Sequence, residues 1–350
     1  MKRTAFCLVL LTGLFVLQVR GEKPPQETRQ AFLKMQDRPR VKPEPQVLSE
    51  KETKGFVEQS LTIATEKKSD GKLERMPILT LRKPDTKGRI PTVIMLHGTG
   101  GSKEQMRPWL EEFAGRGWLA VAIDARYHAD RANGKKGSEA YNEAITKAWR
   151  TPKGEPQEHP FYYDTVWDLW RLVDYLNTRP DVDVKNIAMV GISMGGIQTW
   201  LAASVDDRVK VIIPLIGVQS FRWSLDNNRW HARAKTIQKV HDAAATDIGE
   251  KEVNAKVCEV LWNKLIPGIL DDFDCPNMLK LCAPRPLLIL NGEKDPNCPI
   301  EGARVAFASA DKAYSGNAEK LRHIEAAGVA HSVPDEFKKE TLAWLERWLK

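Results

Sequence analysis

Several features are scarce or missing in this chain of 350 residues. It contains only five cysteines and no Asn-x-Ser/Thr glycosylation sequence. Its 53 basic residues exceed its 46 acidic residues by seven, and no basic cluster with interleaved aromatic side chains occurs. After the first 20 residues, no apolar run approaches the ~20 residues that a membrane-spanning helix needs. These absences argue against nucleic-acid binding and against a membrane-spanning domain.

The few cysteines leave two interpretations open. Cys7 lies in an apolar N-terminal segment, and the other four are Cys258, Cys275, Cys282 and Cys298. In an exported protein an even number permits two disulfides with three possible connectivities, and free buried thiols are nearly as compatible with the sequence. The spacing of these cysteines matches no common zinc-binding pattern. We therefore predict neither a metal site nor a bound cofactor.

The first 21 residues have the pattern of a secretory signal peptide. Lys2 and Arg3 precede an almost entirely apolar segment over residues 5–19, and Gly21 offers a cleavage point. About 15 apolar residues are short for a stable membrane span. We therefore predict that residues 1–21 are removed and that the protein is secreted or periplasmic, without a membrane span. An uncleaved membrane anchor is the alternative. Cleavage would lower the formal net charge from +7 to +4.

The rest of the chain divides into an N-terminal extension and one large domain. Residues 22–55 are rich in Pro, Lys, Glu and Gln, which predicts an extension with one short helix over residues 27–36. Residues 56–350 alternate short apolar strands with helical patterns, except that residues 217–283 show no clear strand. Strands are predicted at residues 56–65, 73–82, 92–96, 118–123, 187–190, 209–215, 286–290 and 321–325.

This alternation predicts the fold class. Short apolar strands that alternate with helices favour an α/β fold, with a mostly parallel sheet of eight strands and helices on both faces. Residues 217–283 then form a helical insertion above one edge of the sheet.

A short motif between a strand and a helix points to a nucleophile. Residues 191–195 read Gly-Ile-Ser-Met-Gly and match the pattern G-x-S-x-G, directly after one predicted strand and directly before a helix. The sharp turn strains Ser193, and the flanking glycines leave room for neighbouring backbone. The free N–H groups of the helix N-terminus favour developing negative charge. We predict Ser193 as a nucleophile, with a glycine-rich turn and an incidental serine as the alternative.

A second glycine-rich loop follows the strand at residues 92–96. His97-Gly98-Thr99-Gly100-Gly101 can direct backbone N–H groups toward the serine. An acyl-transfer intermediate needs two such donors for its oxyanion, and we predict the N–H groups of Thr99 and Met194. The loop lacks the third glycine of a dinucleotide-binding motif and the Gly-Lys-Ser/Thr of a phosphate-binding loop. We expect His97 to orient this loop rather than act as the base.

One of the seven histidines should be the catalytic base. His331 follows the last predicted strand, so it should lie at the same sheet edge as Ser193. A carboxylate must hold the histidine in the correct tautomer. Asp295 lies in the turn after the strand at residues 286–290 and is predicted for this role, with Glu293 as the alternative.

The ordered motifs resemble the α/β-hydrolase superfamily over residues 56–350. The sequence looks most similar to its dienelactone-hydrolase-like, prolyl-oligopeptidase-like and acetyl-xylan-esterase-like members. The dienelactone hydrolases proper use a cysteine nucleophile where this chain has serine, and residues 22–55 are too few for the β-propeller of a prolyl oligopeptidase. The resemblance rests on the His97-Gly98 loop, Gly191 to Gly195, Gly292 to Asp295, Pro299 and His331.

The resemblance implies a serine carboxylesterase that forms an acyl-enzyme intermediate, and the signal-peptide pattern of residues 1–21 adds the expectation of export. Export suggests small esters or acetylated or feruloylated carbohydrates as substrates. The alternatives are an exopeptidase or amidase with the same triad, and a non-catalytic binding protein on a hydrolase scaffold. Aromatic and imidazole side chains can stack on apolar and carbohydrate faces. The predicted substrate contacts of this kind are His97, Tyr127, His128, Trp223 and Trp230.

Overall fold

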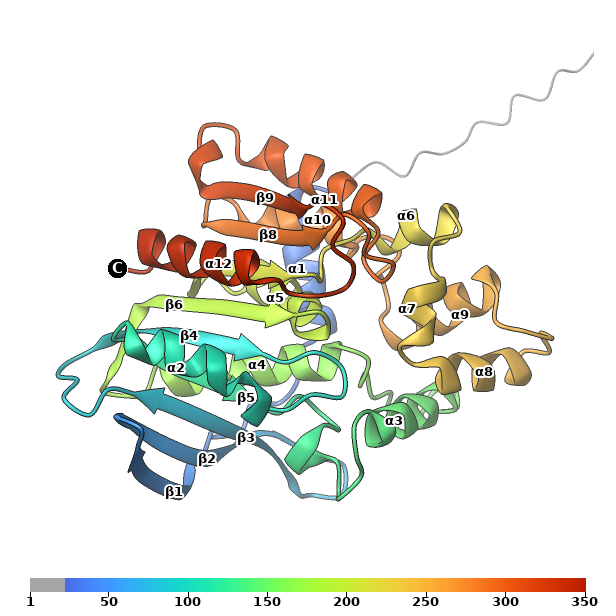
Figure 1. Ribbon diagram of the computed structural model, residues 1–350. Coiled ribbons are helices and arrows are strands. Elements are labelled where there is room, and N and C mark those ends of the chain that lie inside the picture. Colours follow the sequence, from blue (N-terminus) through green and yellow to red (C-terminus); the bar gives the residue numbers. More distant parts are fainter. Residues whose placement is uncertain (1–22) are drawn as a thin grey trace, which may run out of the picture.

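The computed structural model describes residues 23–350, and the predicted signal peptide, residues 1–21, lies outside the described residues. One sheet of nine strands crosses the molecule, with helices on both faces (Figure 1). The strands are β1 (Gln46–Thr53), β2 (Phe56–Lys67), β3 (Leu73–Arg82), β4 (Ile90–Leu96), β5 (Leu119–Ile123), β6 (Val182–Ile192), β7 (Val209–Leu215), β8 (Leu287–Gly292) and β9 (Leu321–Ala326).

The α-helices are α1 (Pro25–Met35), α2 (Arg107–Gly115), α3 (Glu139–Trp149), α4 (Tyr163–Leu176), α5 (Met194–Val205), α6 (Phe221–Asp226), α7 (His231–Lys235), α8 (Gln238–Asp247), α9 (Ala255–Leu265), α10 (Cys275–Leu279), α11 (Ile300–Ala313) and α12 (Asp335–Trp348). Short 3-10 helices are η1 (Glu104–Met106), η2 (Ala129–Arg131), η3 (Lys280–Cys282) and η4 (Ala318–Lys320).

The sheet is antiparallel at one side and parallel over the rest. Neighbouring strands follow the order β1-β2-β3-β5-β4-β6-β7-β8-β9. The pairs from β1 to β5 in this order are antiparallel, and every pair from β5 to β9 is parallel. The carboxyl ends of the parallel strands therefore meet at one edge of the sheet. The predicted α/β fold with a mostly parallel sheet is confirmed.

Each face of the sheet has its own core, because successive strand residues point to opposite faces. On the face covered by α2 and α12, Val93 of β4 joins Phe113 and Phe337 in one buried cluster. On the face covered by α4 and α5, the next residue, Ile94, joins Trp200 in the other cluster. Helix packing on both faces explains why the central strands are apolar throughout.

The sheet has nine strands rather than the predicted eight, because β1 adds to its edge. Residues 46–53 are almost all exposed and lack the apolar alternation that marks a half-buried strand. Backbone pairing with β2 along its length, rather than side-chain burial, makes this segment a strand. Backbone pairing of this kind leaves no trace in the hydrophobic pattern.

The N-terminal helix α1 packs onto the same face as α4 and α5. Phe32 is fully buried and meets Tyr163, Trp170 and Phe273 edge-on, with ring centroids 5.5, 6.1 and 5.0 Å away. The guanidinium of Arg29 donates to the carbonyl oxygens of residues 204, 205 and 281. Helix α1 therefore contributes directly to the hydrophobic core.

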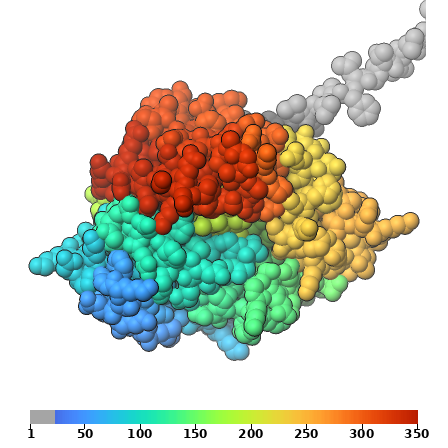
Figure 2. Space-filling view, viewed as in Figure 1, coloured from blue at the N-terminus to red at the C-terminus, as the bar shows by residue number. Residues whose placement is uncertain are grey.

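The insertion is helical, as the sequence predicts, and lies beyond the carboxyl ends of the parallel strands. Helices α6 to α9 form a lobe at the right of Figure 1, and Figure 2 shows this lobe adjoining α3. Buried Asp274 ties the start of the lobe to its end. Its carboxylate accepts hydrogen bonds from Ser220 Oγ at 2.5 Å and from the N–H groups of Phe221 and Cys275 at 2.8 and 2.7 Å.

One pair of sequence-based alternatives can be compared with the described residues, and the membrane-anchor alternative lies outside them. Cys258, Cys275, Cys282 and Cys298 are all buried and free, so the free-thiol interpretation applies rather than two disulfides. Among the helices formed by residues 23–350, none has the length and apolar character needed to cross a lipid bilayer.

Candidate active site

Ser193 occupies a strained turn between β6 and α5. Its backbone has φ 55° and ψ −110°, a positive φ that is uncommon for a residue with a side chain. The turn requires glycine at positions 191 and 195, two residues before and two residues after the serine. A Cβ on Gly191 would lie 2.2 Å from the carbonyl oxygen of Gly195, and one on Gly195 would lie 2.6 Å from that of Leu96. The motif therefore reflects backbone segments in close contact, which hold the serine hydroxyl at the N-terminus of α5.

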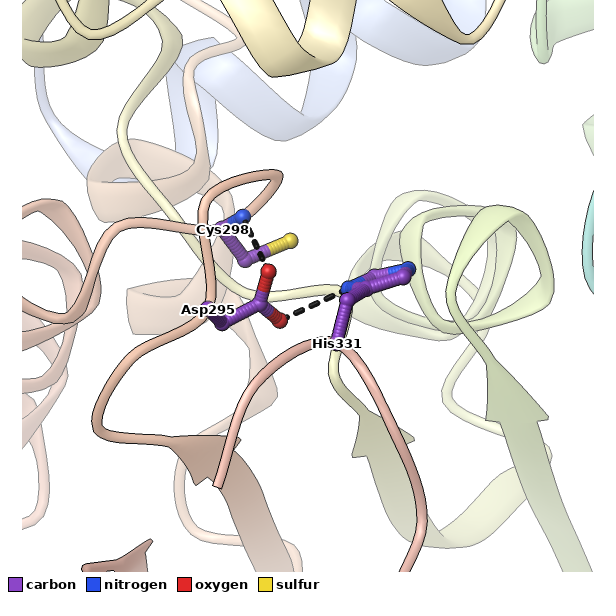
Figure 3. Close-up of side chains that lie close together, drawn as sticks. All are labelled: Asp295, Cys298 and His331. Carbon is purple, nitrogen blue, oxygen red and sulfur yellow. Dashed lines mark hydrogen bonds and ion pairs between the residues drawn. The ribbon is translucent and has the colours of Figure 1, made fainter. Parts of the chain in front are cut away.

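Ser193, His331 and Asp295 form a hydrogen-bonded chain. Ser193 Oγ lies 2.7 Å from His331 Nε2. His331 Nδ1 lies 2.7 Å from Asp295 Oδ2, the contact drawn in Figure 3. Asp295 is buried, and its Oδ1 accepts hydrogen bonds from the N–H groups of Asn297 and Cys298 at 2.8 and 3.0 Å. A carboxylate accepts the proton of Nδ1, so Nε2 is left to accept the serine hydroxyl. This geometry suits proton transfer from Ser193 to His331.

The structure brings Asp295, and not Glu293, to His331. Glu293 is exposed, and its Oε2 accepts the N–H of Gly328 at 2.7 Å. The loop that carries His331 also approaches the end of β8 closely. A Cβ on Gly292 would lie 2.4 Å from the carbonyl oxygens of residues 329 and 330. Two strand ends thus set the distance between acid and base.

The glycine-rich loop after β4 lies against the serine. A Cβ built on Gly98 would lie 3.6 Å from Ser193 Cβ. Thr99 follows in an exposed turn, and Met194 is the first residue of α5, where backbone N–H groups have no partner within the helix. Both predicted oxyanion donors therefore belong to segments that adjoin the nucleophile.

The buried side chain of His97 supports this loop through hydrogen bonds. It is 1% exposed, its Nδ1 lies 2.8 Å from the carbonyl oxygen of Gly98, and its Nε2 accepts the N–H of Ala125 at 3.1 Å. Burial lowers the pKa of His97 to about 4, so the ring is neutral at neutral pH. The histidine links the loop after β4 to the loop after β5.

A buried ion pair anchors the far end of the same loop. The ammonium of Lys103 lies 2.8 Å from Asp124 Oδ2 and 2.6 Å from Asp130 Oδ2. The backbone N–H of Lys103 also donates to Asp124 Oδ1 at 2.8 Å. Asp124 directly follows β5, so this contact ties the loop to the neighbouring strand.

The other predicted substrate contacts have internal partners. His128 is fully buried, with Nδ1 2.8 Å from the carbonyl oxygen of Arg126, and burial lowers its pKa to about 3. The Tyr127 hydroxyl donates to Glu158 at 3.2 Å. Trp223 lies against Gly302 of α11, and Trp230 donates to Asn228 and stacks on a neighbouring ring. A role for these residues in substrate binding stays a prediction.

One cluster of described residues has the spacing of a metal site. The possible ligand atoms of Asp295, Cys298 and His331 all lie within 4.8 Å of one another (Figure 3). The guanidinium of Arg233, however, donates to Cys298 Sγ at 3.0 Å. A positive charge at this position opposes the binding of a metal cation.

Sequence patterns did not reveal Arg233 or Lys103 as parts of this site. Both reach it from outside the catalytic motifs, so no local pattern marks them. The N–H donors to Asp295 could have been found, because an aspartate in a turn often accepts the N–H groups two and three residues later.

Comparisons with known proteins show a family and relatives that this chain resembles. Residues 79–257 match the model of the Dienelactone hydrolase family. A Bacillus subtilis (strain 168) protein named "Putative hydrolase YtaP" is 25% identical over 291 residues, covering 79% of this chain and 84% of that protein.

Two solved structures extend the likeness over nearly the whole chain. The acetyl xylan esterase from Paenibacillus sp. R4 has a TM-score of 0.62 at 17% identity, covering 92% of this chain and 93% of that one. A glucuronoyl esterase from Solibacter usitatus has a TM-score of 0.61 at 16% identity, covering 91% of each chain. The predicted α/β-hydrolase fold is confirmed.

Proposed function

We propose that this protein, which belongs to the dienelactone hydrolase family, hydrolyses carboxylic esters through an acyl-enzyme intermediate on Ser193. The observation that carries the proposal is the chain of two hydrogen bonds, 2.7 Å each, from Ser193 through His331 to Asp295. A serine, a histidine and a buried carboxylate in this arrangement have the geometry of an activated nucleophile.

Acylation begins with the attack of Ser193 Oγ on the ester carbonyl carbon while His331 Nε2 takes the hydroxyl proton. Asp295 stabilises the imidazolium that forms, because its Oδ2 already accepts the proton on Nδ1. The tetrahedral intermediate then collapses, and the imidazolium gives its proton to the departing alcohol. Water then attacks the carbonyl carbon of the acyl-enzyme while His331 takes a proton from it. His331 returns this proton to Ser193 Oγ as the acid is released.

The oxyanion of the tetrahedral intermediate needs two hydrogen-bond donors. We assign this role to the N–H groups of Met194 and Thr99, since both adjoin Ser193 and the N-terminus of α5 favours negative charge. Lys103 and His97 hold the loop that carries Thr99. Donors fixed before the reaction stabilise the transition state without reorganisation.

Labelling and hydrolysis together test the nucleophile. We expect a fluorophosphonate probe to label the protein and short p-nitrophenyl esters to be hydrolysed. Ser193→Ala should abolish labelling and lower kcat about 10⁵- to 10⁶-fold. Ser332→Ala, which changes an exposed serine beside the base, serves as the control and should keep both activities. Full labelling of Ser193→Ala would disprove the assignment.

Substrate class is the second part of the proposal. Structural relatives bear the names acetyl xylan esterase and glucuronoyl esterase, which makes carbohydrate esters the substrates to test first. A panel of acetylated xylan, glucuronate esters and p-nitrophenyl esters of increasing acyl length should give the highest kcat/KM on a carbohydrate ester. Faster hydrolysis of aminoacyl anilides than of every ester would instead identify a peptidase.

We also propose export, on the basis of residues 1–21. The basic start, the apolar segment and the small residue at position 21 have the order of a signal peptide. Expression of the full chain in a secreting bacterium, followed by N-terminal sequencing of the exported protein, should give Glu22 as the first residue. Intact protein retained in the cell would contradict this part.

A further inference from the structure

A buried arginine from the insertion lies beside the acid of the proposed triad. Arg233 belongs to α7, and it is 3% exposed. Among residues 23–350, no carboxylate oxygen lies within ion-pair distance (4.0 Å) of its guanidinium, and its Nε has no hydrogen-bond partner. A charge that is buried without a direct counter-ion is costly, so its position calls for a reason beyond packing.

The guanidinium of Arg233 lies over the ring of Phe221, 5.7 Å from its centroid, and it donates hydrogen bonds to the loop that carries Asp295. Its Nη2 donates to the carbonyl oxygen of Asn297 at 2.9 Å and to Cys298 Sγ at 3.0 Å. The N–H groups of the same two residues donate to Asp295 Oδ1. Arg233 therefore holds the peptide unit between Asn297 and Cys298, whose N–H donates to the carboxylate of Asp295, and it also holds the thiol of Cys298.

Electrostatics identify the charge that Arg233 faces. Burial disfavours the charged form of Arg233, and its neighbours Tyr162, Cys298 and Asp295 more than offset this, so its pKa is raised. Burial raises the pKa of Tyr162 and of Cys298 to about 12, so both are neutral at neutral pH. Among these three neighbours, only Asp295 carries a carboxyl group. The peptide unit between Asn297 and Cys298 joins the two residues, because its C=O accepts from Arg233 and its N–H donates to Asp295.

We propose that Arg233 is a positioning residue that couples the helical insertion to the acid of the triad. Its hydrogen bonds hold the loop at residues 292–298, which carries Asp295 and is here called the acid loop. Its charge stabilises the carboxylate of Asp295 while His331 carries two protons. The proposal rests on the proposed triad. It gives the insertion a part in the chemistry, because a displacement of α7 would move this charge away from Asp295.

Steady-state kinetics of two variants test the proposal. For Arg233→Met, which keeps the length and loses the charge and donors, we expect kcat to fall about 30- to 100-fold with KM unchanged within threefold. For Arg233→Lys we expect a smaller loss, of about 3- to 10-fold in kcat, because an ammonium keeps the charge but cannot reproduce the planar donor geometry. Fluorophosphonate labelling rates should fall in the same order.

Arg222→Met is the matched control. Arg222 lies on α6 of the same insertion, donates to the carbonyl oxygen of Leu270, and pairs with Glu259 and Asp226 rather than with the acid loop. This variant should change kcat less than twofold. All rates are normalised to the fraction of folded protein by thermal unfolding.

Three results would overturn the proposal. The first is a loss of kcat/KM that comes from KM, which would mean that Arg233 acts in substrate binding. The second is an equal loss of kcat in Arg233→Met and Arg222→Met. The third is a wild-type kcat in Arg233→Lys. The last variant decides the question even if Arg233→Met fails to fold. Failure of the proposed function would look different, since the wild-type protein would then neither hydrolyse esters nor react with the probe.

Discussion

Two loops flank Ser193, and they are anchored by different parts of the molecule. The loop at residues 97–103 is held by the buried ion pair of Lys103 with Asp124, which follows the neighbouring strand β5. The loop at residues 292–298 is held by Arg233, which comes from the helical insertion. One anchor belongs to the sheet that builds the fold, and the other belongs to a lobe added to it.

This difference separates what the sheet alone supplies from what the insertion adds. The loop at residues 97–103, here called the oxyanion loop, is positioned by contacts between adjacent strand ends. Its geometry should therefore stay the same when the insertion is changed. The acid loop receives part of its support from α7, so its geometry depends on how the insertion packs. Substitutions in the two loops can therefore distinguish losses of chemistry from losses of stability.

The largest expected effect is on the chemistry of the acid loop. Asp295→Asn should lower kcat about 10⁴-fold, because an amide cannot hold His331 in the required tautomer or stabilise its imidazolium. Glu293→Gln is the matched control and should change kcat less than about threefold. Initial rates with a p-nitrophenyl ester measure both. Comparable losses in the two variants would mean that the wrong carboxylate has been assigned.

The next effect concerns the close contact between the backbone at Gly191 and the backbone at Gly195, on either side of Ser193. Gly191→Ala should lower the free energy of unfolding by about 4 kcal/mol or more, since the new Cβ would meet backbone that cannot move aside. Gly98→Ala, whose Cβ would have ordinary contacts at 3.6 Å, should cost about 1 kcal/mol or less. Urea unfolding monitored by tryptophan fluorescence compares them. A normal stability for Gly191→Ala would refute the steric argument.

A somewhat smaller effect is expected at the sheet-borne anchor. Lys103→Met should destabilise the protein by about 3–5 kcal/mol, because it leaves the carboxylate of buried Asp124 without its cation. Lys135→Met, which removes an ion pair between more exposed side chains, should cost less than about 1 kcal/mol. If urea unfolding gives equal values for the two variants, the buried pair does not anchor the loop.

The smallest effect is the share that each buried histidine contributes to the pH dependence of stability. Burial lowers the pKa of His97 and of His241 to about 4, below the usual value of 6.5. Between these values the unfolded chain binds a proton that the folded one does not, so stability falls as the pH falls. From pH 7.5 to 5.5 the loss should be about 1.4 kcal/mol for each such histidine.

Unfolding in urea at the two pH values measures this loss, and His97→Gln should remove one histidine's share. A stability that rises on acidification to pH 5.5 would be inconsistent with neutral buried imidazoles. His97 lies in the loop at residues 97–103 and His241 lies on α8 of the insertion, so each side of the comparison contributes a share of this effect.

The central strands, their helices and the order of the motifs could be predicted from the sequence because they depend on local patterns. Apolar runs such as residues 92–96 and 209–215 mark buried strands wherever they occur. Strand β1 could not be found in this way, because backbone pairing with β2 forms it and its side chains remain exposed. The core position of α1 likewise depends on aromatic partners far along the chain.

The sequence by itself determined the strained serine turn and the edge of the sheet at which Asp295 and His331 lie. These features follow from strand ends and from glycines next to each motif, which are local. Only the tertiary structure decided that Arg233 and Lys103 support the two loops. Their contacts span long distances in the chain, and a buried charge is placed by the packing that excludes water around it.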